Sequence, residues 1–135
     1  MTKVLHTDKA PAAIGPYVQG VDLGNMVMTS GQIPVIPSTG EIVSDDVEKQ
    51  ARQSLDNVKA VIESSGLHVK DIVKMTVFVK DLNDFSAVNE IYGAFFDEHQ
   101  VANYPARSCV EVARLPKDVK IEIEAIAVRN DGIMG

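Results

Sequence analysis

The side chains best suited to chemistry lie on the last two predicted strands, near the end of the chain. Arg107 and Cys109 alternate along the first of these strands, and Glu122 and Glu124 alternate along the second. Alternation places each pair on one face of its strand. If the two strands form a hairpin, Cys109 falls opposite Glu122 and Arg107 opposite Glu124, so that Arg107 and Glu122 are diagonal neighbours.

Such a group predicts a small site for a carboxylate. The guanidinium of Arg107 matches a carboxylate with two parallel hydrogen bonds. Glu122 could exchange protons with a bound molecule or orient a water. Cys109 could act as a nucleophile only as the thiolate, which neighbouring carboxylates oppose. On pattern alone, such a group is more often a cross-strand salt bridge beside a small buried cysteine.

A second group of candidates comes from the first half of the chain. The runs 17–21 and 26–30 flank the turn-rich loop 22–25, which predicts a hairpin with Tyr17 opposite Ser30 and Gly31 just beyond it. A packed tyrosine ring and a turn glycine are the ordinary interpretation. The loop 31–40, with three Pro and Gly breakers after its first residue, is expected to cross the surface.

Two amphipathic helices should position these strands. Asp45 is the expected N-cap of the first helix and Gly66 its stop, with apolar residues recurring between them at helical spacing. The second helix starts near Asp84. Its apolar stripe consists of Phe85, Val88, Tyr92, Phe95, Phe96 and His99. Asn89 lies off that stripe, so the pattern alone places it in solvent.

The remaining strands are expected at 72–80, 106–112 and 119–128. In the first of them, Val73, Met75, Val77 and Val79 should share one face. The predicted order is β-β-loop-α-β-α-β-β. It indicates an α+β fold, a mixed sheet with two helices on one face. A single domain covers 1–135, and 129–135 forms a loose C-terminal tail.

Composition excludes several functional classes. The 135 residues hold 13 Lys and Arg against 19 Asp and Glu, a formal charge of −6, so the chain should repel phosphate backbones and we expect no nucleic-acid partner. One cysteine excludes an intrachain disulfide, and the three histidines show no metal-ligand spacing. Without a signal peptide or an apolar run near 20 residues, we expect no membrane partner and a cytoplasmic location.

Long motifs of this sequence strongly resemble the RidA/YjgF family, in its RidA subfamily. The longest is YPARSCVEVARLPKDVKIEIEAIAV at 104–128, and shorter matches occupy 12–20, 29–34, 50–59 and 80–85. The resemblance extends from about Lys9 to Arg129. It implies a chorismate-mutase-like fold that assembles as a homotrimer, with sheets packed into a central barrel and sites in the clefts between subunits.

The resemblance also implies a reaction. Members of the family hydrolyse 2-iminobutanoate and 2-iminopropanoate, released by pyridoxal-phosphate-dependent threonine and serine dehydratases, to 2-keto acids and ammonia. No cofactor and no metal is implied. Carried over to this sequence, Arg107 binds the substrate carboxylate and Glu122 positions or activates water. The pocket is lined by Tyr17 from the subunit across the cleft, Ser30, Gly31, Asn89 and Cys109.

Other functions remain open from the sequence. The same pocket could hold a 2-keto acid such as 2-ketobutyrate without turnover, as a binding or sensing module that also needs Arg107. An endoribonuclease role has been attached to the family, but the negative charge and the lack of a basic aromatic groove oppose it. A chaperone-like or redox role would depend on the thiol of Cys109.

Overall fold

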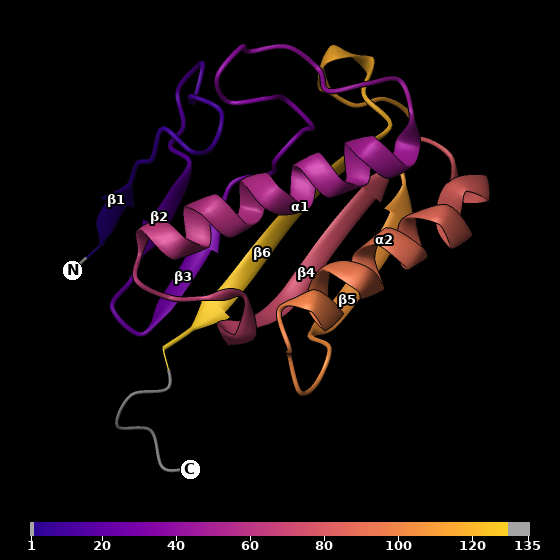
Figure 1. The fold of residues 1–135 in the computed structure, drawn as a ribbon. Helices are drawn as coiled ribbons and strands as arrows, with labels where there is room; N and C mark the ends of the chain where they lie inside the picture. The colour runs from indigo at the N-terminus through magenta and orange to yellow at the C-terminus, as the bar shows by residue number, and fades with distance from the viewer. Residues whose placement is uncertain (1, 130–135) are drawn as a thin grey trace.

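The computed structural model describes residues 2–129, which form one six-stranded sheet with the strand order β1-β2-β3-β6-β4-β5. The strands are β1 (Lys3–Leu5), β2 (Gly20–Asp22), β3 (Met26–Thr29), β4 (Ile72–Val79), β5 (Ala106–Glu111) and β6 (Ile121–Val128). The helices are α1 (Val47–Ser64) and α2 (Phe85–Glu98), and three short 3-10 turns are η1 (Val69–Asp71), η2 (Leu82–Asp84) and η3 (Pro116–Asp118). Only β4 and β5 pair in parallel among these strands. Both helices cover the same face (Figure 1), which confirms the predicted α+β fold with a mixed sheet.

Helix α1 lies across the middle of the sheet and buries its predicted apolar stripe. Leu55, Val58 and Ile62 are fully buried against the strands. The N-cap is Asp46 rather than the predicted Asp45, because the carboxylate of Asp46 accepts a hydrogen bond from the backbone N–H of Lys49 at 2.9 Å. The helix ends as expected before Gly66, whose φ of +91° suits glycine.

The chain between β4 and β5 passes through α2, so β5 returns parallel to β4 at the edge of the sheet. Helix α2 begins after its N-cap Asp84, as predicted, and buries Val88, Phe95 and Phe96. At its C-cap, the ring of His99 lies 2.7 Å from the backbone oxygen of Phe95.

Strand β4 lies between β6 and the edge strand β5, and its two faces differ chemically. Met75, Val77 and Val79 are fully buried under the helices, as the alternation predicted. The prediction is wrong for Val73, which is 44% exposed. A register irregularity between Ile72 and Lys74 interrupts the alternation, so Ile72 is buried instead.

Among residues 2–129, no helix covers the opposite face of the sheet, here called the open face (Figure 1). The strand registers bring an apolar group to it, with Met28, Phe78, Val110 and Ile126 among its members. Met28 is 39% exposed and Val110 is 43% exposed. An apolar sheet surface of this kind is typical of a face that another molecule covers.

Several predicted boundaries need correction. Strand β1 was missed, since three residues carry too little pattern to be recognised. The loop 31–40 does not stay on the surface, because Gln32 and Val35 are buried. Arg129, counted in the predicted tail, donates to the carboxylate of Asp22 at 2.8 Å, and the rest of that tail lies outside the described residues.

Candidate functional site

Strand β5 presents Arg107 to the helix-covered face of the sheet. Arg107 is paired with Met75 of β4, and paired residues on parallel neighbours point to the same side. Its guanidinium Nη1 donates to the side-chain oxygen of Asn89 at 2.6 Å. The guanidinium carbon lies 4.9 Å from the ring centre of Tyr92 and 5.4 Å from that of Phe85. Helix α2 therefore holds the arginine from one side.

Cys109 lies beside this arginine, two residues further along the same face of β5 and paired with Val77. We call Asn89, Arg107 and Cys109 the arginine cluster. Burial raises the pKa of the Cys109 thiol, and the charge of Arg107 opposes that rise only in part. The thiol is therefore mostly protonated at neutral pH, which disfavours a nucleophilic role.

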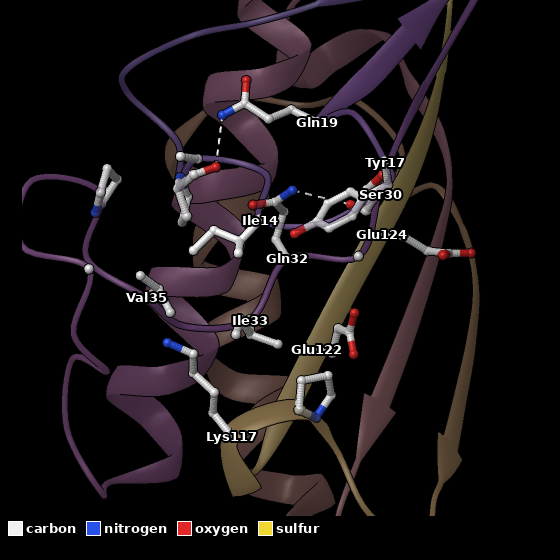
Figure 2. A pocket seen from close by; sticks show the side chains of 16 residues that line it. Ile14, Tyr17, Gln19, Ser30, Gln32, Ile33, Val35, Lys117, Glu122 and Glu124 are labelled. Carbon is white, nitrogen blue, oxygen red and sulfur yellow. Dashed lines mark hydrogen bonds between the residues drawn. The ribbon is translucent and has the colours of Figure 1, made fainter.

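Glu122 lies on the other face of the sheet, paired with Phe78 of β4. Burial, and then the like charge of Glu124, raises the pKa of its carboxyl group. The carboxylate borders a cavity of about 800 Å³, below Ser30 and Tyr17 in Figure 2. A carboxylate with a raised pKa in a cavity is a candidate for proton transfer.

Gly31 lies directly against Glu122, because the loop that follows β3 begins by pairing with β6. The next residue, Gln32, exchanges two backbone hydrogen bonds with Ile123 of β6, at 2.7 and 3.1 Å. A Cβ atom added to Gly31 would come within 2.9 Å of the carboxyl carbon of Glu122 and closer still to one of its oxygens. Glycine at this position therefore leaves room for the carboxylate.

We expect Gly31→Ala to lower kcat about tenfold while changing the free energy of unfolding by less than about 1 kcal/mol. The added methyl group meets the end of a flexible side chain, so Glu122 moves away rather than the backbone. Steady-state kinetics and thermal unfolding measure the two effects. In the Glu122→Ala background, where the space is free, Gly31→Ala should change neither quantity, and a full effect there would contradict the explanation.

Tyr17 and Ser30 line the same cavity but are not cross-strand partners, so the predicted hairpin register is wrong by two residues. Gly20 pairs with Thr29, and Tyr17 precedes β2 in a turn where its N–H donates to the oxygen of Gly15. The register shifts because Asp22 belongs to the strand, not to the loop. The hydroxyl of Ser30 donates to the backbone oxygen of Val18 at 2.6 Å. We call Tyr17, Ser30, Gly31 and Glu122 the glutamate cluster.

The predicted hairpin of the last two strands is also wrong. β4 lies between β5 and β6, so Cys109 is not opposite Glu122 and Arg107 is not opposite Glu124. The crossover through α2 places β5 on one side of β4, and the segment 112–120 then carries the chain past the end of β4 to its other side. The alternation within each strand was predicted correctly, but the partner strand was not.

These registers place the two clusters on opposite faces of one sheet. Arg107 faces α2 with Met75, whereas Glu122 faces away from the helices with Phe78. The structure thus brings Tyr17, Ser30, Gly31 and Glu122 together at the cavity, and Asn89 and Arg107 together under α2. Within one chain, it does not bring Arg107 to Glu122. Each cluster holds half of the chemistry expected of a carboxylate site.

Sequence analysis missed the two rings that contact Arg107. Phe85, Asn89 and Tyr92 follow one another at steps of four and three, a spacing that aligns them on one face of a helix. This spacing was a usable signal, because it places an amide and two aromatic rings on a common line. The helical pattern alone put Phe85 and Tyr92 in the core and Asn89 in solvent, whereas the family resemblance put Asn89 in the pocket.

Within residues 2–129, no three His, Cys, Asp or Glu side chains gather closely enough to hold a metal ion. No helix in that range combines the length and the apolar character needed to span a membrane.

Comparison with known proteins places these features in a family. A family model described as Endoribonuclease L-PSP matches residues 7–129. A relative from Escherichia coli (strain K12), named 2-iminobutanoate/2-iminopropanoate deaminase, is 74% identical over 129 residues, which cover 96% of this chain and 99% of the relative.

Solved structures agree with that match. A crystal structure from Vibrio vulnificus CMCP6 is 82% identical with a TM-score of 0.92, covering 94% of this chain and 99% of its own. The crystal structure of E. coli TdcF with bound serine is 69% identical with a TM-score of 0.91, covering 94% and 98%. A match over nearly the whole length, in both sequence and fold, identifies this chain as a member of the RidA/YjgF family.

Proposed function

We propose that this protein is a hydrolytic deaminase of reactive 2-imino acids and their enamine forms, with 2-iminobutanoate and 2-iminopropanoate as substrates. The products are the 2-keto acid and ammonia. The observation that carries the proposal is the guanidinium of Arg107, which Asn89 and two rings hold at the edge strand of the sheet. A fixed, partly buried guanidinium suits the carboxylate that every 2-imino acid carries.

The relatives support the same chemistry. The 74% identical protein of E. coli is named for these two imines, and the E. coli TdcF structure contains serine, which also carries a carboxylate. Overall identity of the two chains does not test the roles of the individual site residues. The variants proposed below address that point.

In the proposed reaction, Arg107 binds the carboxylate and holds the imine carbon in place. Glu122 positions a water and accepts its proton as the oxygen attacks that carbon. Glu122 passes this proton to the nitrogen, and the proton of the new hydroxyl group follows through the same carboxylate as the C–N bond breaks, ammonia leaves and a C=O bond forms. Tyr17, Ser30, Gly31, Asn89 and Cys109 line the pocket around the substrate. Because an imine hydrolyses in water unaided, the enzyme needs to lower only a small barrier, and positioning of the substrate and the water supplies most of that acceleration.

We propose further that the site forms between subunits of a homotrimer. Arg107 and Glu122 lie on opposite faces of one sheet, so a complete site needs the arginine cluster of one protomer and the glutamate cluster of its neighbour. The exposed apolar side chains of the open face, such as Met28 and Val110, support assembly because packing against another copy removes them from water. A closed ring of three identical protomers repeats the same shared site three times.

Mixing two inactive variants tests the shared site. Arg107→Ala and Glu122→Ala protomers are unfolded together in equal amounts and refolded. A site is intact when each variant supplies its unaltered half, so about one quarter of the wild-type activity should return.

The control mixes wild type with the Arg107→Ala/Glu122→Ala double variant. Shared sites again give about one quarter of the wild-type activity, whereas sites built within one protomer give about one half. Sites within one protomer would also leave the first mixture inactive. That pair of results would contradict the proposed arrangement.

Turnover itself is tested by competition with semicarbazide. A threonine dehydratase generates 2-iminobutanoate in the assay, and semicarbazide traps it as an absorbing product. The protein should lower the amount of trapped product in proportion to its concentration. Unchanged trapping together with binding of 2-ketobutyrate, measured by calorimetry, would favour the non-catalytic binding module. A cytoplasmic location is part of this proposal, since the protein must meet the imine before water or other nucleophiles consume it.

A further inference from the structure

One face of α2 contacts Arg107 through three different side chains. Phe85, Asn89 and Tyr92 occupy successive turns of the helix on the side facing β5. Asn89 takes one N–H of the guanidinium, through the 2.6 Å hydrogen bond of Nη1. The two rings lie 4.9 and 5.4 Å from the guanidinium carbon, within the range in which a cation is attracted to an aromatic face.

Tyr92 is buried, but its hydroxyl makes no hydrogen bond within the described residues. The side chain is 6% exposed. Burial raises the pKa of this hydroxyl to about 12, although the charge of Arg107 lies close enough to oppose the rise. The contact that Tyr92 makes with Arg107 therefore depends on its ring and not on a hydrogen bond.

A free arginine side chain has many rotamers, and a single hydrogen bond to Asn89 leaves the guanidinium able to pivot about that bond. The guanidinium carbon lies over the rings of both Tyr92 and Phe85, and these rings restrict the pivot. The remaining N–H groups are then held in a restricted plane, and a pair of them is available to a carboxylate.

We infer that Tyr92, together with Phe85, is a positioning residue that holds the guanidinium of Arg107 in the orientation that binds a carboxylate. The kinetic consequences of this inference rest on the proposed function. The contact between the rings and the guanidinium of Arg107 is present in the protein without substrate. Tyr92 acts through Arg107 and does not touch the substrate. Because the carboxylate is bound alike in the substrate and in the transition state, loss of this contact raises KM and leaves kcat nearly unchanged.

Three variants separate the ring from the hydroxyl and from packing. Tyr92→Leu removes the ring and is expected to raise KM for the imine about tenfold, with kcat within about threefold of wild type. Tyr92→Phe keeps the ring and should restore KM to within about threefold of wild type. Phe96→Leu is the matched packing control. It alters a buried ring whose centre is 5.0 Å from that of Tyr92, but its KM should stay at the wild-type value.

A second readout needs no substrate. The Nε–H signal of Arg107, identified by its loss in Arg107→Lys, is followed by nuclear magnetic resonance in the full-length protein. In wild type and Tyr92→Phe, the signal should be shifted upfield by the ring and exchange slowly with water. In Tyr92→Leu, it should move to the position of a free arginine and exchange faster.

The inference is overturned if Tyr92→Leu keeps both the wild-type KM and the shifted Arg107 signal. An equal rise in KM in Tyr92→Leu and Phe96→Leu would also overturn it, because packing alone would then explain the effect. Failure of the proposed function appears differently, as wild-type protein without turnover. The resonance experiment then still decides whether the ring holds the guanidinium of Arg107.

Discussion

Arg107→Ala should lower kcat/KM for 2-iminobutanoate by about a thousandfold, the largest effect we expect from any single substitution. The guanidinium is the only part of the arginine cluster that carries a full positive charge. Removing it leaves the substrate carboxylate without its charged partner in a partly buried site, which costs about 2–5 kcal/mol. The semicarbazide competition assay measures the loss directly.

Arg107→Lys refines this expectation. Lysine keeps the charge but presents one compact ammonium group in place of a planar fork. It also loses the geometry in which one nitrogen bonds Asn89 while others remain free. We therefore expect a loss of about thirtyfold to a hundredfold, smaller than that of Arg107→Ala.

Arg52 provides a matched control for both variants. Its guanidinium carbon lies 5.5 Å from the ring centre of Phe95, and it is paired with Asp56 and Glu98 between the helices. Arg52→Ala thus removes an arginine with a similar ring and polar partners, but away from both clusters. It should retain wild-type kcat/KM. If Arg107→Ala were as active as Arg52→Ala, Arg107 would not be the carboxylate-binding residue.

Glu122→Gln should lower kcat by about a hundredfold to a thousandfold while changing KM little. The amide fills the same space beside Gly31 and can still accept a hydrogen bond, but it cannot take a proton from water. The loss should therefore appear in the chemical step. Single-turnover measurements with imine generated in the assay test this, and a KM effect without a kcat effect would instead indicate a role in binding.

The pH profile of the wild type follows from the same carboxyl group. Its pKa is raised above the ordinary value, first by burial and then by Glu124. Glu122 must be ionised to accept a proton, so kcat should fall as the pH drops through this raised pKa. The fall should begin at a higher pH than an ordinary glutamate would give.

Glu124→Gln isolates the electrostatic cause. Removing the neighbouring charge favours the ionised form of Glu122, so the acid limb of the profile should move to lower pH. Glu111→Gln is a suitable control, since Glu111 is exposed on β5 and its side chain accepts from the N–H of Leu82. If the acid limb stayed at the same pH in Glu124→Gln, a group other than Glu122 would control the pH profile.

The helices and strands of this fold could be predicted from the local spacing of apolar residues, because each of them buries one apolar face. The helices ending near Gly66 and starting near Asp84 were predicted closely, as were the long strands β4 and β6. Errors occurred where local pattern competes with geometry. The irregularity near Val73 reverses an alternation that the residue types alone would continue.

The sequence prediction wrongly placed Arg107 next to Glu122 within one chain, because it paired the wrong strands. Residue types and alternation show that Arg107 and Cys109 share one face of a strand, and that Glu122 and Glu124 share one face of another. The sequence does not show which strand lies between them. Two strands joined by a short loop usually pair with each other, and that expectation made one cluster out of two.

By itself, the sequence determined the α+β class and the family, and it supplied the candidate residues of the proposed site. It could do so because alternation, helical spacing and long motifs are properties of neighbouring residues. Tertiary structure alone decided that β4 separates β5 from β6, and that Arg107 faces α2 while Glu122 faces away. Strand order depends on how the whole chain crosses the sheet and buries its apolar surface, and no local segment contains that information.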